Sequence, residues 1–251
     1  HLTSAVALHP TAAEFRNDLG YAYLRAGQFD AALRQLATAA ELAPDGPAPL
    51  DEDAQTAAMR ALESGARCVI IAGNSVLEDP EALRILQGIA DKTGAQLLAP
   101  TSNRRMERGA GRVAIDKIPY PINAAIECLA PYGRAILVEA MPPVAFFAYP
   151  GKPSLLLPAD CDVVTLAGPD GDGPAALAAL ADRIGAKPGA ARDTAMPARP
   201  QAGGITLKNL GAALANALPA DAIIVDESVT CGAAAFPAGD AAGPNSWLSL
   251  T

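Results

Sequence analysis

Hydrophobic runs alternate with amphipathic stretches from residue 67 to residue 185. The run Cys68–Ala72 is apolar without polar alternation, as expected for a strand buried on both faces of a parallel sheet. Acidic residues and Pro80 then start a helix, and Gln96–Ala99 is the next short strand. The same pattern predicts a helix at 121–129, strands at 135–138, 154–157 and 163–166, and a helix at 174–184. Strands that alternate with helices in this way predict an α/β fold with a doubly wound, mainly parallel, Rossmann-like sheet.

The first 46 residues have a different pattern, which resembles the tetratricopeptide repeat. The matching positions are Leu19, Gly20, Tyr23, Gly27, Phe29, Ala32, Ala39, Leu42 and Pro44. Ala5, Leu8 and Pro10 precede the last three of these by 34 residues, which is the period of that repeat. The resemblance implies an α-helical segment, 1–46, of about one and a third repeats; an ordinary helical hairpin is the alternative.

In such a hairpin, the two antiparallel helices approach closely at Gly20 and Ala32. Tyr23 and Phe29 are expected to fill the space between them, Gly27 to make the turn, and Pro44 to end the second helix. One repeat and a fragment cannot bury a solenoid core. The segment is therefore expected to add little stability, and a protein partner could bind through it.

Composition and charge exclude several classes of protein. The chain has 251 residues, of which 51% are hydrophobic and 18% charged, so it is globular. Its net charge of -8 argues against nucleic-acid binding, because phosphate contacts need a basic face. We expect no membrane span and no secretory signal, because a continuous apolar run of the required length and a basic start are both missing. The four cysteines form no CxxC pair, which predicts buried thiols in a cytoplasmic protein.

Two segments rich in proline separate the predicted units. Residues 47–49 form an extended linker, after which Asp51 caps a helix that continues to residue 62. Residues 186–204 are rich in Pro, Gly, Ala and Arg and are predicted to be an interdomain linker. Beyond it, Thr206 caps a helix to Leu218, and a buried strand follows at 223–226.

Two further stretches are candidates for chemistry. Four arginines among glycines at 103–112 could bind phosphates or a carboxylate, although a solvated loop with an Arg–Glu pair is favoured. In the segment 134–153, aromatic residues lie between prolines. This pattern suggests a rigid, partly exposed loop, and the alternative is a hydrophobic lid on the core.

These stretches resemble the middle domain of thiamine-diphosphate-dependent enzymes, in the branch of the acetolactate synthase large subunit and benzoylformate decarboxylase. The matching segments are 108–112, Pro119-Tyr120-Pro121, and 143–154, which reads Pro-Val-Ala-Phe-Phe-Ala-Tyr-Pro-Gly-Lys-Pro-Ser. A second block, 223–228 with 245–251, resembles the opening of the pyrophosphate-binding domain. The resemblance implies a middle domain at 47–185, the linker at 186–204 and a truncated pyrophosphate-binding domain at 205–251.

The resemblance also implies a cofactor, a substrate and candidate site residues. Its enzymes are homo-oligomeric transferases and lyases that use thiamine diphosphate and magnesium to act on 2-oxo acids. Glu227, Ser228 and Thr230 follow the predicted strand 223–226, where they would contact the cofactor diphosphate; a capping turn is the alternative. FAD is not expected, because no GxGxxG follows the first strand. Where some decarboxylases carry a histidine, this chain has Phe146 and Phe147.

Catalysis by this chain is not expected. The pyrimidine domain that supplies an activating glutamate is not encoded, and the magnesium motif would lie beyond Thr251. Gly171-Asp172-Gly173 resembles that motif, but its context predicts an acidic turn before the helix that begins at Pro174. The sequence thus predicts a partial, inactive acetolactate synthase-like protein. The alternative is a protein-interaction module in which the tetratricopeptide segment binds a partner and the α/β domain is structural.

Overall fold

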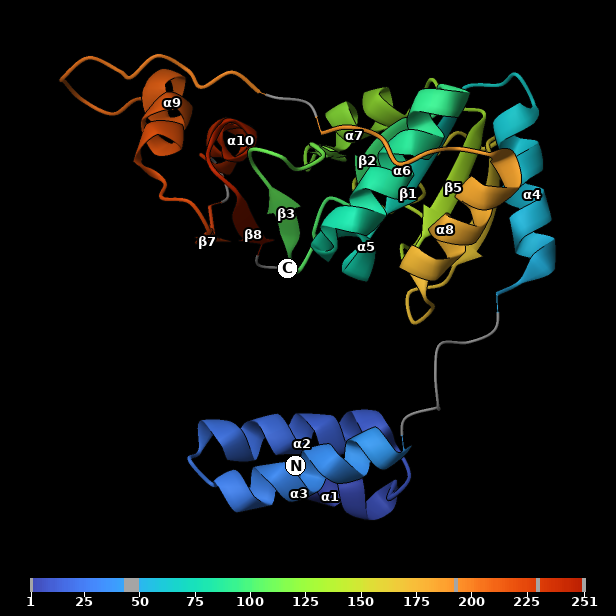
Figure 1. Cartoon of the computed structure of the whole chain (residues 1–251), viewed down its shortest axis with the longest axis vertical. Coiled ribbons are helices and arrows are strands. Elements are labelled where there is room, and N and C mark those ends of the chain that lie inside the picture. The colour runs from blue at the N-terminus through green and yellow to red at the C-terminus, as the bar shows by residue number, and fades with distance from the viewer. Residues whose placement is uncertain (1, 43–49, 192–193, 229–230, 250–251) are drawn as a thin grey trace. The chain divides into compact units, whose positions relative to one another are not determined.

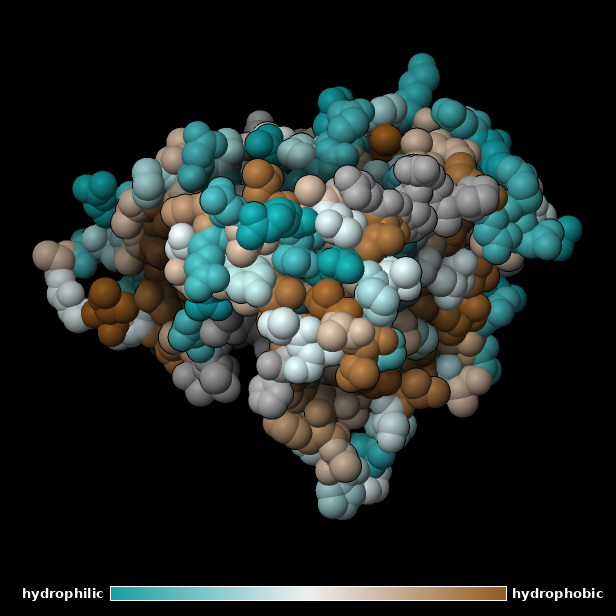
Figure 2. Space-filling model, turned by 90° about the horizontal axis from the view of Figure 1, so that it is seen from below, coloured by the Kyte–Doolittle hydropathy of each residue, from teal (hydrophilic) through white to brown (hydrophobic). Residues whose placement is uncertain are grey.

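A computed structural model describes residues 2–42, 50–191, 194–228 and 231–249. The chain divides into two compact units, 1–48 and 49–251, and each is considered by itself. None of the helices in the described ranges combines the length and apolar character needed to cross a bilayer. Figure 2 shows hydrophobic and hydrophilic residues intermixed over the face in view.

The first unit contains a helical hairpin. Its helices are α1 (Leu2–Leu8), α2 (Ala13–Arg25) and α3 (Phe29–Leu42). The predicted close approach is confirmed, because a Cβ on Gly20 would lie 2.7 Å from the Leu36 side chain, and Ala32 is buried. Gly27 makes the turn with a φ of 71°. Its identity as a tetratricopeptide repeat stays a prediction, and Pro44 lies outside the described residues.

One part of the predicted hairpin packing is wrong. Phe29 does not fill the space between the helices, because its side chain is 68% exposed. Tyr23 is only partly buried. Because the residues at the contact are small, the two helices pack closely without the Phe29 ring between them.

The second unit is built on a parallel five-stranded sheet, sheet A, with the order β4-β2-β1-β5-β6. Figure 1 labels its central strands β2, β1 and β5. Its strands are β1 (Cys68–Ala72), β2 (Gln96–Ala99), β4 (Asp116–Lys117), β5 (Arg134–Val138) and β6 (Asp162–Ala167). Every residue of β1 is buried, as its unbroken apolar run predicted. The α/β fold with a parallel sheet is therefore confirmed.

Helices cover both faces of sheet A. They are α4 (Glu52–Glu63), α5 (Asn74–Glu78), α6 (Pro80–Thr93), α7 (Ile122–Leu129) and α8 (Gly173–Ile184). Ile70 belongs to a core with residues of α4, α6 and α8, while its neighbour Val69 packs with residues of α7. The central strands β1 and β5 are buried on both faces, which explains why β1 lacks polar alternation, whereas much of the edge strand β6 is exposed. The predicted cap of α4 is confirmed, since Asp51 accepts hydrogen bonds from the backbone of Asp53 and Ala54.

A second, three-stranded sheet, sheet B, has the order β3-β8-β7. Its strands are β3 (Met106–Arg108), β7 (Ala222–Asp226) and β8 (Asn245–Ser249), accompanied by the helices α9 (Leu207–Ala217), α10 (Gly232–Ala235) and α11 (Ala238–Ala241). β7 is parallel to β8, and β3 is antiparallel to it. Sheet B thus joins a segment of the predicted middle domain to the chain beyond residue 205.

The strand predicted at 223–226 exists, but the expectation that it is buried is wrong. β7 is an edge strand, and the side chains of Ile223 and Val225 are 71% and 56% exposed. Ile224, on the other face, packs against the core. An apolar run predicts burial on both faces, whereas β7 buries one face only.

The strand predicted at 154–157 is also wrong. This stretch is a loop with a single antiparallel bridge between Leu155 and Val144. Pro153 and Pro158 flank it, and proline cannot donate to a ladder of strand hydrogen bonds.

The predicted linker 186–204 contains no helix or strand in its described part. Its beginning nevertheless packs along α6, where the Gly189 amide donates to the Arg84 carbonyl at 2.7 Å. Figure 1 shows this segment in orange as it leaves α8 and passes α6.

All four cysteines carry free thiols, and only Cys68 is fully buried. Burial raises the pKa of Cys68 to about 11. Cys128, Cys161 and Cys231 are partly buried, so the predicted burial holds for Cys68 alone.

Candidate functional site

The carboxyl end of β7 carries a connected group of polar side chains around Asp226. One Asp226 oxygen accepts the Ser228 amide at 2.9 Å and the Ser228 hydroxyl, and the other accepts the Trp247 indole N–H at 3.1 Å. Burial alone would raise the pKa of Asp226. These hydrogen bonds and the charge of Lys117 outweigh burial and lower the pKa below its ordinary value. Asp226 is thus held as a carboxylate.

Lys117, the last residue of β4, brings a positive charge to the same place. Its ammonium donates to the Ser249 hydroxyl at 3.3 Å and lies 4.2 Å from the centre of the Phe236 ring. Burial lowers the pKa of Lys117, the nearby Asp226 carboxylate counteracts this, and Arg108 lowers it further. We call the residues Asp226, Ser228, Lys117, Trp247 and Ser249 the β7 cluster.

The predicted cofactor residues meet the β7 cluster only in part. Ser228 belongs to it, the Glu227 side chain is exposed to solvent, and Thr230 lies outside the described residues. The backbone amide and the hydroxyl of Ser228 both donate to Asp226. The neighbouring side chains of Asp226 and Glu227 are both acidic. A diphosphate needs donors and positive charge, so the described residues do not by themselves fit one.

Sequence reasoning missed Asp226, Trp247 and Lys117 as members of this cluster. Asp226 is the last residue of the predicted strand 223–226, and Trp247 and Lys117 lie far from it in sequence. The single tryptophan of the chain was the available signal, because a buried indole N–H needs an acceptor.

The arginine-rich stretch 103–112 is not wholly a solvated loop, because one of its arginines is buried. Arg108 lies in β3 and is fully buried. It pairs with Asp240 at 2.6 Å, and its guanidinium lies 3.5 Å from the centre of the Phe236 ring. The expected Arg–Glu pair does occur, because Arg105 contacts Glu107 at 2.7 Å. Arg108 therefore stabilises sheet B and is not available to a ligand.

Gly171-Asp172-Gly173 forms the turn that was predicted before α8. The Asp172 side chain accepts the Ala175 amide at 2.9 Å, which makes it the N-cap of the helix. Among the described residues, no group of three or more His, Cys, Asp or Glu side chains could hold a metal ion. Asp172 thus has a structural role.

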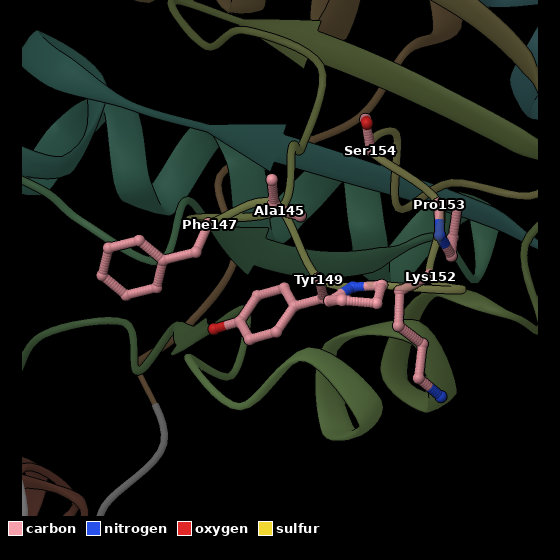
Figure 3. A pocket seen from close by; sticks show the side chains of 8 residues that line it. Ala145, Phe147, Tyr149, Lys152, Pro153 and Ser154 are labelled. Atoms are coloured by element: carbon pink, nitrogen blue, oxygen red, sulfur yellow. The ribbon is translucent and has the colours of Figure 1, made fainter.

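The loop after β5 exposes a row of aromatic rings. Phe146, Phe147 and Tyr149 of this loop, with Tyr120 from the segment before α7, contact one another in tilted and edge-to-face pairs, with successive ring centres 5.3, 5.0 and 6.2 Å apart. Phe146 and Phe147 are each 55% exposed, which confirms the partly exposed loop and not the lid. The loop lines a hollow of about 260 Å³ in which Lys152 points away from the Phe147 and Tyr149 rings (Figure 3). Its polar groups do not converge on one point.

Two solved structures, both described as thiamine-diphosphate-dependent enzymes, share the fold of this chain. One is a "putative thiamin diphosphate-dependent enzyme" from Mycobacterium smegmatis, with a TM-score of 0.60 and 19% identity, covering 82% of this chain and 43% of that one. The other is a thiamine diphosphate-dependent 4-hydroxybenzoylformate decarboxylase from Rhodococcus jostii RHA1, with a TM-score of 0.59 and 19% identity, covering 84% of this chain and 43% of that one.

A curated relative has a higher sequence identity to this chain than these two structures have. The chain is 38% identical over 192 residues to a protein of Mycobacterium tuberculosis named "Putative acetolactate synthase large subunit IlvX". The chain is homologous to this acetolactate synthase-like protein, as the sequence motifs predicted. The alignment covers 76% of this chain but only 36% of the relative. No family model matches the chain.

Proposed function

We propose that this chain is a part of an acetolactate synthase-like, thiamine-diphosphate-dependent enzyme that joins or decarboxylates 2-oxo acids. The homology over 192 residues at 38% identity carries the proposal. The parallel five-stranded sheet supports it, because two structures of thiamine-diphosphate-dependent enzymes share the fold.

Within that enzyme, the carboxyl end of β7 is proposed to meet the diphosphate end of the cofactor through Glu227, Ser228 and Thr230. Ligands of α/β proteins bind at the carboxyl ends of parallel strands, and Ser228 follows the end of β7, whose last residue, Asp226, pairs with Ser249 of β8. The Ser228 hydroxyl would have to turn from Asp226 toward the ligand. Magnesium, supplied with the cofactor, would offset the charge of the two nearby carboxylates.

Residues 1–251 alone are proposed not to catalyse the reaction. Asp172, the aspartate of the one Gly-Asp-Gly in the sequence, is engaged as a helix cap. A few hydrogen bonds of about 0.5–1.5 kcal/mol each at the β7 cluster cannot hold a flexible diphosphate tightly. The chain would then contribute some of the residues that contact the cofactor and hold them in position, and other residues would complete the site.

Calorimetry and nuclear magnetic resonance test these statements together. We expect no micromolar binding when the protein is titrated with thiamine diphosphate and magnesium, and no carbon dioxide release from pyruvate or benzoylformate. At millimolar cofactor, the amides of Glu227, Ser228 and Thr230 should shift, while that of Asp170, in the turn before α8, should not. Shifts elsewhere, or shifts that persist unchanged in Ser228→Ala, would contradict the site. Carbon dioxide release would contradict the proposed inactivity.

A second candidate function concerns the helical hairpin. Its described helices expose large apolar side chains, namely Leu8, Tyr21, Leu24, Phe29 and Leu33. Such residues favour packing against another helix or peptide, as a tetratricopeptide segment would do. Fluorescence anisotropy of residues 1–46 with amphipathic helical peptides tests this, using Leu33→Asp as the matched variant. Absence of saturable binding, or equal binding by the variant, would rule it out.

A further inference from the structure

The strand order of sheet A reverses between β1 and β5. From β1 the chain passes to its neighbour β2 on one side, and from β5 it passes to β6 on the other. In open α/β sheets, the crevice beyond the carboxyl ends of two such strands is where ligands bind, often through their phosphates. The residues found there, Ser75, Glu139 and Gly173, are not members of the β7 cluster.

In this protein the crevice contains the side chain of Glu139, the residue that follows β5. Glu139 is 4% exposed, and its carboxylate accepts three hydrogen bonds. The Ser75 amide and hydroxyl each lie 2.6 Å from a carboxylate oxygen, and the Gly173 amide lies at 2.7 Å. Backbone amides and a hydroxyl are the donors that bind a phosphate oxygen in a loop of this kind.

The backbone around Glu139 is shaped for this arrangement. Glu139 has a φ of 50°, a conformation that is uncommon for a residue other than glycine. A Cβ on Gly173 would lie 2.8 Å from the Glu139 carboxyl carbon, and a Cβ on Gly73 would lie 2.5 Å from the Glu139 carbonyl oxygen. Both segments that face the crevice therefore approach Glu139 as closely as glycine allows. A strained residue whose side chain is fully hydrogen-bonded is held in place by its surroundings.

We propose that Glu139 is an internal anion that occupies the ligand crevice of sheet A in place of a phosphate group. Glu139 thereby determines specificity: the crevice takes no diphosphate-containing ligand, although its position and its donors suit one. The proposal concerns the crevice alone and does not depend on the proposed function at β7.

Thermal denaturation of the full chain with inorganic pyrophosphate tests the proposal, using sodium chloride of equal ionic strength as reference. In Glu139→Gly the carboxylate is removed, and glycine accepts the positive φ. Pyrophosphate should raise the Tm of this variant saturably, because a ligand that binds only the folded state stabilises it. Glu139→Gln, which still fills the crevice, is the matched control. The control and the native protein should show no shift beyond that of the salt.

Two results would overturn the proposal. One is a saturable Tm shift in the native protein as large as that of Glu139→Gly. The other is no pyrophosphate-dependent shift in Glu139→Gly. If this variant does not fold in plain buffer, it is refolded with pyrophosphate. Recovery of the native circular dichroism supports the proposal, and failure to recover it in pyrophosphate overturns it.

Discussion

At the scale of single residues, Arg108 depends on a partner distant in the sequence. Its guanidinium is 1% exposed, pairs with Asp240, and donates to the Phe236 carbonyl at 3.2 Å. Burial lowers the pKa of Arg108, and it raises the pKa of Asp240 despite the attraction between the two charges. Burial removes water from both charged groups, so each charge depends on the other for its stabilisation.

Asp240→Ala should therefore be strongly destabilising. The substitution leaves Arg108 buried without its carboxylate, which costs about 3–5 kcal/mol. Urea unfolding followed by circular dichroism measures the loss. Glu81→Ala is the control: Glu81 forms an exposed pair with Arg84, and its loss should change stability by less than about 1 kcal/mol. Equal effects of the two substitutions would contradict the structural role of Arg108.

Asp226 makes stability depend on pH in the acid range. Its pKa in the folded protein is lowered, so its contribution is complete above the pKa of the unfolded chain. That contribution is lost as the pH falls through the lower, folded-state pKa. The stability difference between the native protein and Asp226→Asn should be constant near neutrality and shrink below about pH 4. Urea unfolding at a series of pH values checks this, and a difference that does not change with pH would contradict it.

At the scale of elements, the sequence pattern predicted the strands that are apolar along their whole length and the helices whose start signals lie in their own sequence. β1 was found because all its residues are apolar, and α6 because acidic residues and Pro80 mark its start. β3 was missed, since Met106-Glu107-Arg108 is short and charged and is a strand only through pairing with Ser246 and its neighbours. The β7 cluster could not be predicted for the same reason: Asp226 meets Lys117 and Trp247 through tertiary packing.

The N-terminus of α8 provides a test of an element. Asp172→Ala removes the side-chain cap and should cost about 1 kcal/mol of stability. Magnesium should have the same small effect on the Tm of the variant and of the native protein, because Asp172 is not proposed to bind metal. Asp170→Ala, an exposed position in the same turn, is the matched control and should change stability by at most about 0.5 kcal/mol. A magnesium-dependent Tm that is lost in Asp172→Ala would show that the motif binds metal.

At the scale of the whole molecule, sheet B binds the two predicted domains of the second unit together. β3 comes from the predicted middle domain, and β7 and β8 come from the segment beyond the linker. Trp247 and Phe236 pack edge to face with ring centres 5.3 Å apart, and both belong to the core that includes Ile70 of β1. Residues 50–185 and 205–249 are therefore expected to unfold together.

The first unit is expected to contribute little to that transition. Leu19, Ala32 and Ala39 are buried within its own helices, and the prolines at 47 and 49 favour an extended connection. Deletion of residues 1–48 should leave the main melting transition within about 1 kcal/mol of the full chain. Differential scanning calorimetry of both proteins measures this, and the full chain with Gly20→Leu, which disrupts the hairpin through the Leu36 contact, is the matched variant. If the deletion and Gly20→Leu both lower the main transition by several kcal/mol, the hairpin is an integral part of the fold and not an appended segment.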